Sequence, residues 1–252
     1  MRNSSHIAMK IAAGLVAFGM FAPVASAEDD ARAILKSMSD YLAKQPTFSA
    51  KFDSDIEVLT TDLQKIQFTS SGWIAVRRPD KLHAIRTGGY ADVEMVFDGR
   101  QLVIHARNAK LYAQMDASGS IDELIAKLES QGYAFPGADL LFSNVYDELN
   151  AGVLDAKHIG SGVVNGVQCE HLAFRNSETD WQLWVRTGAE PIPCKYVITS
   201  KEVAGAPQYT LTINDWSSNV SDKFSFVPPA GVKKVDAKAL PSTDEVPEGV
   251  SK

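Results

Sequence analysis

The side chains best suited to covalent chemistry in this 252-residue sequence are its two cysteines, Cys169 and Cys194. In an oxidising compartment such a pair usually forms a disulfide. If the predicted strands pair in sequence order, the cysteines flank the strand around Arg186 at twice the roughly 4.8 Å strand spacing. Cα atoms beyond about 7 Å cannot be bridged without backbone movement. Because Pro191 and Pro193 give the strand of Cys194 an irregular start, we predict that the chain bends there and that the disulfide forms.

Histidines could supply acid–base catalysis or metal ligands. Beyond residue 27 the chain has four, His83, His105, His158 and His171. Each falls on or beside a predicted strand, and none lies at metal-ligand spacing from another His or Cys. We interpret them as surface or hydrogen-bonded structural residues, and we expect no metal site.

Three acids, Asp53, Asp55 and Glu57, share one face of a predicted strand. A row of this kind could hold a hard cation or serve as acid and base, but it is more typical of the solvated face of a half-buried strand. The sequence also lacks the His-Glu-x-x-His, Gly-x-Ser-x-Gly and Walker motifs. We therefore expect no enzyme, no catalytic residues and no cofactor. An enzyme would require this acid row, or His83 with His105, to converge in a cleft.

The first 27 residues have the pattern of a signal peptide. Arg2 and Lys10 are the charged residues of this segment, residues 11–21 are apolar but too few to span a bilayer, and residues 25–27 read Ala-Ser-Ala. We predict cleavage after Ala27, export to the periplasm and no later membrane span.

The charge of the chain disfavours polyanionic partners. The formal net charge is −6, and loss of the two cations of the signal peptide makes it about −8 by the same counting. Phosphate-rich surfaces bind clustered Lys and Arg. We therefore expect no nucleic acid partner and no anionic membrane surface as a partner.

The elements that position these residues are mostly predicted strands. Apolar residues recur at helical spacing between residues 31 and 42 and then alternate at period two. Asp98-Gly99 and Asn165-Gly166 are hairpin signals between alternating segments. A capping box at residues 120–123 starts one helix, and Pro136 precedes another.

These elements predict an α+β fold that is mainly β. A twisted antiparallel sheet of about ten strands curls rather than stays flat. We predict an unclosed β-barrel with helices packed on its concave face. Residues 1–27 form the cleaved signal peptide, residues 28–229 a single half-barrel domain, and residues 230–252 a flexible C-terminal tail.

Large apolar side chains are predicted on the inner face of the sheet and on the helix that should cover it. They are Phe48, Phe52, Phe68, Met95, Phe97, Leu141, Phe142 and Tyr146. Such a set is typical of an ordinary packed core. The functional alternative is the lining of a cavity that admits an acyl chain, and these residues are then the candidate ligand-binding set.

Nearly the whole chain after the signal peptide resembles the DUF2092 family of predicted periplasmic proteins, and the second half is the most specific part of the resemblance. The matching segments are Val164-Asn165-Gly166-Val167, residues 169–175, residues 180–184, residues 191–199 and Pro207-Gln208-Tyr209. That family is similar in fold to the LolA, LolB, LppX and RseB group, an unclosed β-barrel whose helices plug a hydrophobic cavity. The segments at 77–82 and 97–102 look like the Arg-Pro turn and Asp-Gly hairpin of that group. The resemblance supplies no catalytic residue.

Two functions are compatible with these features. The first is a periplasmic, non-catalytic binding protein for a lipid, an acyl chain or a lipidated protein, held between sheet and helices. The second, which the resemblance to RseB permits, is a regulatory module that senses envelope stress by binding a membrane protein, without lipid transport.

Overall fold

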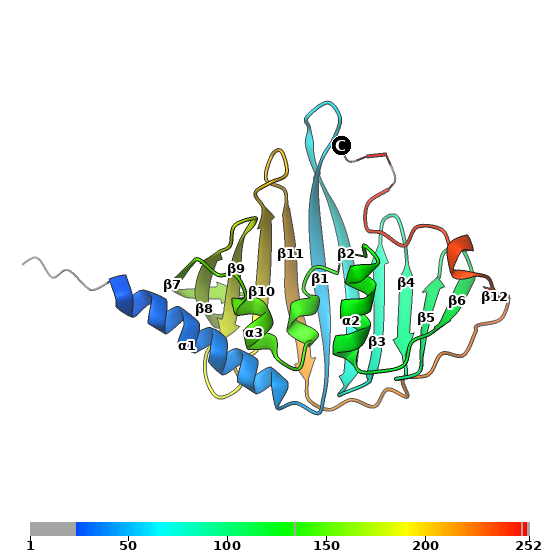
Figure 1. The fold of residues 1–252 in the computed structure, drawn as a ribbon, viewed down its shortest axis with the longest axis horizontal. Helices are drawn as coiled ribbons and strands as arrows, with labels where there is room; N and C mark the ends of the chain where they lie inside the picture. Colours follow the sequence, from blue (N-terminus) through cyan, green and yellow to red (C-terminus); the bar gives the residue numbers. More distant parts are fainter. Residues whose placement is uncertain (1–23, 134, 248, 251–252) are drawn as a thin grey trace, which may run out of the picture.

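The computed structural model describes residues 24–133, 135–247 and 249–250. Its strands fall into two groups that follow the two halves of the chain (Figure 1). The first group is β1 (Thr47–Leu59), β2 (Lys65–Arg77), β3 (Lys81–Gly88), β4 (Val93–Phe97), β5 (Gln101–Ala106) and β6 (Leu111–Asp116). The second is β7 (Asp155–Val164), β8 (Val167–Arg175), β9 (Thr179–Arg186), β10 (Pro193–Ser200) and β11 (Gln208–Ser217). A short strand, β12 (Lys233–Lys234), follows them.

All these strands form one twelve-stranded sheet in the order β12-β6-β5-β4-β3-β2-β1-β11-β10-β9-β8-β7. Each group is a meander, and β1 joins the two because it pairs antiparallel with β2 on one side and β11 on the other. The sheet curves strongly and does not close into a barrel (Figure 1). The predicted fold class is confirmed. The number of strands is twelve rather than about ten, and β12 departs from the antiparallel pattern because it pairs parallel with β6.

The helices lie on the concave face. They are α1 (Val24–Ala43), α2 (Ile121–Ser130), the short 3₁₀ helix η1 (Ala138–Leu141) and α3 (Val145–Asn150). The capping box of α2 forms as predicted, with Ser120 and Glu123 each accepting the backbone N–H of the other. The single helix expected after Pro136 is divided into η1 and α3, because Phe142 between them has an extended backbone with ψ of 154°.

The predicted signal peptide falls mostly on residues 1–23, which lie outside the described residues. Helix α1 starts at Val24, so the predicted cleavage after Ala27 would fall within its first turn. That cleavage stays a prediction. In the described part of the chain, no helix is long and apolar enough to cross a membrane.

Two clusters of buried side chains pack between the helices and the sheet. The first lies under α1 and α3 and includes Leu35 of α1 and Leu183 of β9. The second lies under α2 and includes Ile121 of α2 and Phe97 of β4. Trp216 on β11 packs against both clusters. The two cores therefore meet where β11 meets β1.

After β11 the chain crosses the convex face of the first meander. Phe224 is buried beneath the Arg77 guanidinium, 4.8 Å from its ring centre. Phe226 packs against His105 and Tyr112, which alternate with inward-facing residues on β5 and β6. The chain then pairs with β6 through β12 at the edge of the sheet and continues into the 3₁₀ helix η2 (Ala237–Ala239).

The segment predicted to be a flexible tail, residues 230–252, makes specific contacts within its described part. Besides the pairing of β12 with β6, the Glu245 carboxylate accepts a hydrogen bond from the Ser54 hydroxyl. The domain limits and the mobility of this segment stay predictions.

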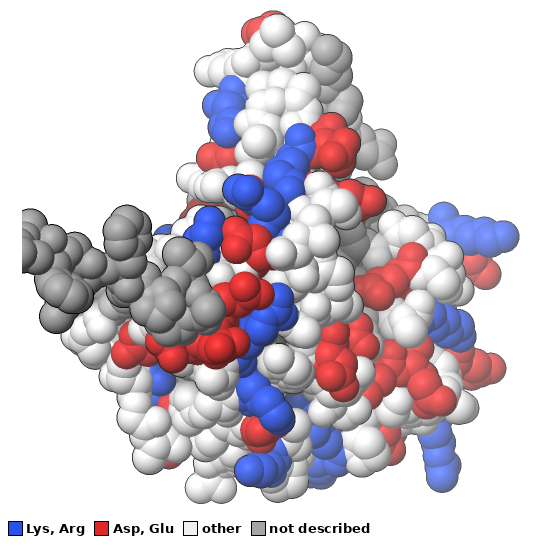
Figure 2. All heavy atoms as spheres, turned by 60° about the vertical axis from the view of Figure 1, so that its left-hand side comes forward, with Lys and Arg blue, Asp and Glu red and all other residues white. Residues whose placement is uncertain are grey.

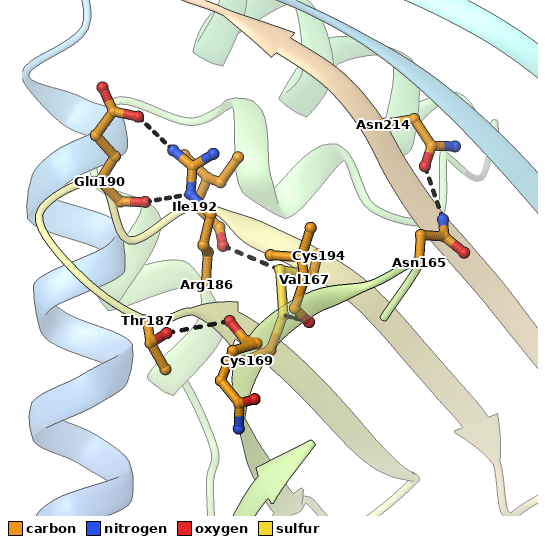
Figure 3. Close-up of a disulfide and its surroundings, with 10 residues drawn as sticks. Asn165, Val167, Cys169, Arg186, Thr187, Glu190, Ile192, Cys194 and Asn214 are labelled. Atoms are coloured by element: carbon orange, nitrogen blue, oxygen red, sulfur yellow. Dashed lines mark hydrogen bonds and ion pairs between the residues drawn. A yellow bond between two sulfur atoms is a disulfide. The ribbon is translucent and has the colours of Figure 1, made fainter. Parts of the chain in front are cut away.

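Cys169 and Cys194 form a disulfide, with their Cα atoms 7.1 Å apart (Figure 3). The bond spans β9, because Cys169 on β8 lies opposite Arg186 on β9 and β10 lies on the other side. The register of β10 shifts between Pro193 and Lys195, so Cys194 is in a β-bulge. This bulge shortens the distance that two regular strand spacings would impose. The strands around the cysteines therefore pair in sequence order, as predicted, and the predicted disulfide also forms.

We predict that the disulfide contributes about 3 kcal/mol to the free energy of unfolding, since it closes a loop of 25 residues. Urea unfolding of the oxidised protein should show this loss on addition of a reductant. The double variant C169A/C194A should be insensitive to reductant and should resemble the reduced protein. Equal midpoints for the oxidised and reduced wild type would contradict the prediction.

Candidate functional site

The concave face is organised in rows, because residues directly opposite one another in antiparallel strands share a face. Phe48, Leu82 and Phe97 lie in one such row, beneath α2, and each is at most 5% exposed. They pack in the same cluster as the apolar residues of α2. Of the candidate ligand-binding residues, Phe48 and Phe97 are therefore positioned as core residues.

Four further candidate residues also contact the two cores. Phe142 is buried, and Met95 and Leu141 are partly buried, all in or against the cluster under α2. Tyr146 of α3 packs against the other cluster and lies beneath the Lys36 ammonium. The candidate set is thus divided between the two cores and does not surround one site.

Phe52 and Phe68, the last two candidates, lie farther along the β1–β2 hairpin, where they belong to neither cluster. Phe68 is directly opposite Ile56, which shares the face of Phe52 on β1. All three side chains are half-buried. We call Phe52, Ile56 and Phe68 the upper strip. Phe52 and Phe68 are the candidate residues that lie outside both clusters, and together with Ile56, which was not a candidate, they can offer apolar surface to a ligand.

Gly72 makes room for the upper strip. It lies directly opposite Phe52, and a Cβ atom at this position would come within 2.2 Å of the Phe52 ring. The ring therefore lies over the backbone of β2, which a larger residue at position 72 would prevent.

Polar side chains lie on the same face, and the Ser54–Ser70 row separates Phe52 from Ile56 and Phe68 within the upper strip. Ser54 and Ser70 are opposite each other and buried, and Arg86 is opposite Gly72. Tyr209 is opposite Ile56, and burial raises its pKa to about 12, with a further contribution from the Glu245 carboxylate. This polar group was not among the residues predicted from the sequence. It could have been found because Ser54, Ser70 and Arg86 fall at strand positions whose alternation points to the inner face of the sheet.

Residues 243–245, near the C-terminus, contact this polar group. Glu245 Oε2 is 3.1 Å from the Ser54 hydroxyl, and Glu245 Oε1 is 3.6 Å from Arg86 Nη1. Arg86 Nη2 also donates a hydrogen bond to the Thr243 carbonyl. Residues of the predicted tail are therefore held on the concave face by an arginine and a serine of the sheet.

On the convex face, His83 and His105 converge on one carboxylate. Glu94 is 3.0 Å from His83 Nε2 and 3.0 Å from His105 Nδ1. The second nitrogen of His83 is 2.9 Å from Asp222, which belongs to the segment that crosses this face. Both imidazoles are largely buried, at 13% and 4% side-chain exposure. His83 and His105 therefore meet in a buried network that holds a crossing segment, whereas an enzyme would require them to converge in a cleft.

The other two histidines are hydrogen bonded as well. His158 bonds the Glu170 carboxylate at 2.8 Å, and His171 bonds the Gln182 side chain at 2.9 Å while it stacks on Trp184. Within residues 24–133, 135–247 and 249–250, no group of three or more His, Cys, Asp or Glu side chains is arranged to hold a metal ion.

The acid row is part of the polar convex face. Asp53 accepts a hydrogen bond from Ser71, and Asp55 accepts one from Thr69. Glu57 accepts the backbone N–H of Gln208 and pairs with Lys65. Each acid is thus bound to a neighbouring strand. The interpretation of this row as a solvated strand face fits these contacts.

A buried pair of ionisable groups lies under η1. Tyr196 donates a hydrogen bond to Asp139 at 3.1 Å. Burial raises the pKa of the Asp139 carboxyl above its usual value and raises that of Tyr196 well above 10.0. Because both groups are packed between η1 and β10, we assign the pair a structural role.

The surface charges are mixed in sign. On the side of the molecule that Figure 2 shows, acidic and basic side chains are interspersed, and the described residues there form no broad basic patch.

We predict that Glu94→Ala lowers the free energy of unfolding by about 2 kcal/mol, because it removes the carboxylate that both imidazoles contact and leaves the largely buried ring of His105 without that partner. Urea unfolding at neutral pH measures this loss. Asp55→Ala on the exposed part of the same face is the control and should change stability by less than about 0.5 kcal/mol. Equal effects of the two variants would show that the histidine network does not stabilise the fold.

Comparison with solved structures finds several similar proteins. Lipoprotein LppX of Mycobacterium tuberculosis has 12% identity and a TM-score of 0.49, with 77% of this chain and 98% of LppX covered. LprF of Mycobacterium bovis has 10% identity and a TM-score of 0.45, with 82% and 99% covered. MucB in the Pseudomonas aeruginosa MucA/MucB complex has 12% identity and a TM-score of 0.43, with 79% of this chain and 61% of that chain covered.

Comparison with curated proteins finds no match. A family model described as "Predicted periplasmic protein (DUF2092)" matches residues 31–237, which include all the strands and the helices α2, η1 and α3. This description places the protein in the periplasm, as the sequence analysis expects. The match covers most of the chain, and the protein therefore belongs to the DUF2092 family of predicted periplasmic proteins.

Proposed function

We propose that this protein binds a lipid, an acyl chain or a lipidated protein in the periplasm, on the concave face of its sheet, and catalyses no reaction. The observation that supports this proposal is the upper strip. Phe52, Ile56 and Phe68 are apolar, half-buried and outside both core clusters. Because burial of apolar surface is favourable in proportion to its area, such a strip favours an apolar ligand.

Burial of an acyl chain can supply the free energy of binding without charged contacts. Burial of about 16 methylenes at about 0.8 kcal/mol each gives roughly 13 kcal/mol before the costs of association. Those costs are about 4 to 15 kcal/mol. Partial burial along the upper strip would therefore support weak and reversible binding.

The arrangement of the ionisable groups supports a non-catalytic role. Glu94 and Asp222 are hydrogen bonded to His83, and Asp139 is hydrogen bonded to Tyr196. General acid–base catalysis requires a group within hydrogen-bond reach of a substrate. These groups instead bond one another.

A second candidate function is the regulatory interaction module, and one surface favours it. β7 is the sheet edge opposite β12. Leu154 just before it and Ile159 and Val163 on it are 70%, 55% and 66% exposed. Exposed edge strands with apolar side chains can add a strand from a protein partner.

We predict that protein purified from periplasm carries lipid, which solvent extraction and mass spectrometry would identify. Phe68→Gln should reduce the bound lipid about tenfold, since it removes roughly 1.5 kcal/mol or more of apolar contact. Thr69→Gln, next to it on the opposite face of β2, is the matched control and should retain wild-type lipid.

The same preparations separate the two functions. A protein that is empty in both wild type and variants would sink the lipid-binding proposal. If such an empty protein copurified with a membrane protein that Ile159→Asp released, the interaction module would be supported instead.

A further inference from the structure

The C-terminal segment ends on the face that the proposed function assigns to the ligand. From η2 at the β6 edge, the chain runs across the concave side to residues 243–245, which contact β1 and β3 (Figure 1). We call residues 240–247 the C-terminal segment. It lies beyond the family match, which ends at residue 237. The strands it covers lie within that match.

The contact between this segment and the sheet is mainly electrostatic. The Glu245 carboxylate lies between the Ser54 hydroxyl at 3.1 Å and the Arg86 guanidinium at 3.6 Å. Both charged side chains are largely removed from solvent, with Arg86 22% and Glu245 12% exposed. Ser54 and Arg86, next to the upper strip, thus bind a carboxylate of the chain itself.

Arg86 retains a donor that the C-terminal segment does not use. Its Nε atom is buried and has no hydrogen-bond partner within the described residues. Arginine binds carboxylates and phosphates best through two parallel hydrogen bonds. The segment contacts Nη1 through Glu245 at 3.6 Å and Nη2 through the Thr243 carbonyl, so no carboxylate makes two parallel hydrogen bonds with the guanidinium.

The register of the sheet places this arginine beside the apolar surface. Arg86 is directly opposite Gly72, and Gly72 is directly opposite Phe52, whose ring lies over the glycine. A molecule with its acidic group at Arg86 would therefore extend its apolar part over Phe52 toward Ile56 and Phe68. This is the geometry of an amphiphile with one charged end.

We propose that Arg86 and Ser54 bind the acidic head group, carboxylate or phosphate, of an anionic amphiphile, and that the C-terminal segment occupies this site through Glu245 until the ligand displaces it. This inference rests on the proposed lipid-binding function and specifies its ligand class and its regulation. Ligand binding then requires exchange of one acidic group for another on Arg86, and the net charge of the site is unchanged.

The test compares palmitate with hexadecanol, which has the same chain length but no charge. Affinities are measured for the full-length protein by titration below the critical micelle concentration. Arg86→Met should lower the ratio of palmitate to hexadecanol affinity at least tenfold. Glu245→Gln should raise palmitate affinity at least fivefold, because the internal competitor loses its charge. Asp244→Asn, on the exposed neighbouring residue, is the control and should leave both affinities unchanged.

Amide hydrogen exchange gives an independent measurement. Palmitate should accelerate exchange in residues 240–247 of the wild type, whereas inorganic phosphate alone should have a much smaller effect if the apolar part is required. If phosphate alone releases the segment as well as palmitate does, the site recognises a free anion and the amphiphile proposal is wrong.

The outcomes separate this inference from the function on which it rests. Binding of both probes with an affinity ratio that Arg86→Met leaves unchanged would overturn the inference and leave lipid binding intact. Failure of wild type and Glu245→Gln to bind either probe would overturn both.

Discussion

The pairing of β1 with β11 is the interaction on which the rest of the structure depends. It joins two meanders that are each continuous in sequence, and it brings Trp216 of β11 onto Phe48 of β1, with ring centres 4.7 Å apart. Trp216 contacts both core clusters. One curved concave face exists because this contact between distant segments holds.

The two faces of the joined sheet are covered by different means. Helices cover the concave face over the two cores, and beyond them Thr243 and Glu245 contact Ser54 and Arg86, the polar neighbours of the upper strip. The convex face of the first meander is covered by the segment with Phe224 and Phe226, fixed through Asp222 and His83. The chain between Asp222 and Glu245 thus contacts both faces of the sheet.

Local patterns predicted much of the architecture because they reflect neighbouring residues. The capping box at Ser120 and the turn at Asn165-Gly166, where both residues have positive φ, are local in this sense. The division of the helix after Pro136 was not predicted, because the extended Phe142 is followed by Ser143, whose backbone N–H bonds Asp122 of α2. Of the candidate ligand residues, alternation placed Phe48 and Phe52 on the correct face. Alternation could not show that Phe48 lies in the core under α2 whereas Phe52 lies outside it.

The sequence alone determined the class of fold, the compartment and the faces of the strands, because hydrophobic period, turn residues and a signal pattern act over a few residues. It also indicated the disulfide, although only the bulge at Cys194 explains how the bond spans β9. The tertiary structure decided which apolar residues are core and which remain half-exposed. It also brought Glu245 to Arg86 and both histidines to Glu94, since contacts between residues far apart in sequence depend on how the whole sheet curves.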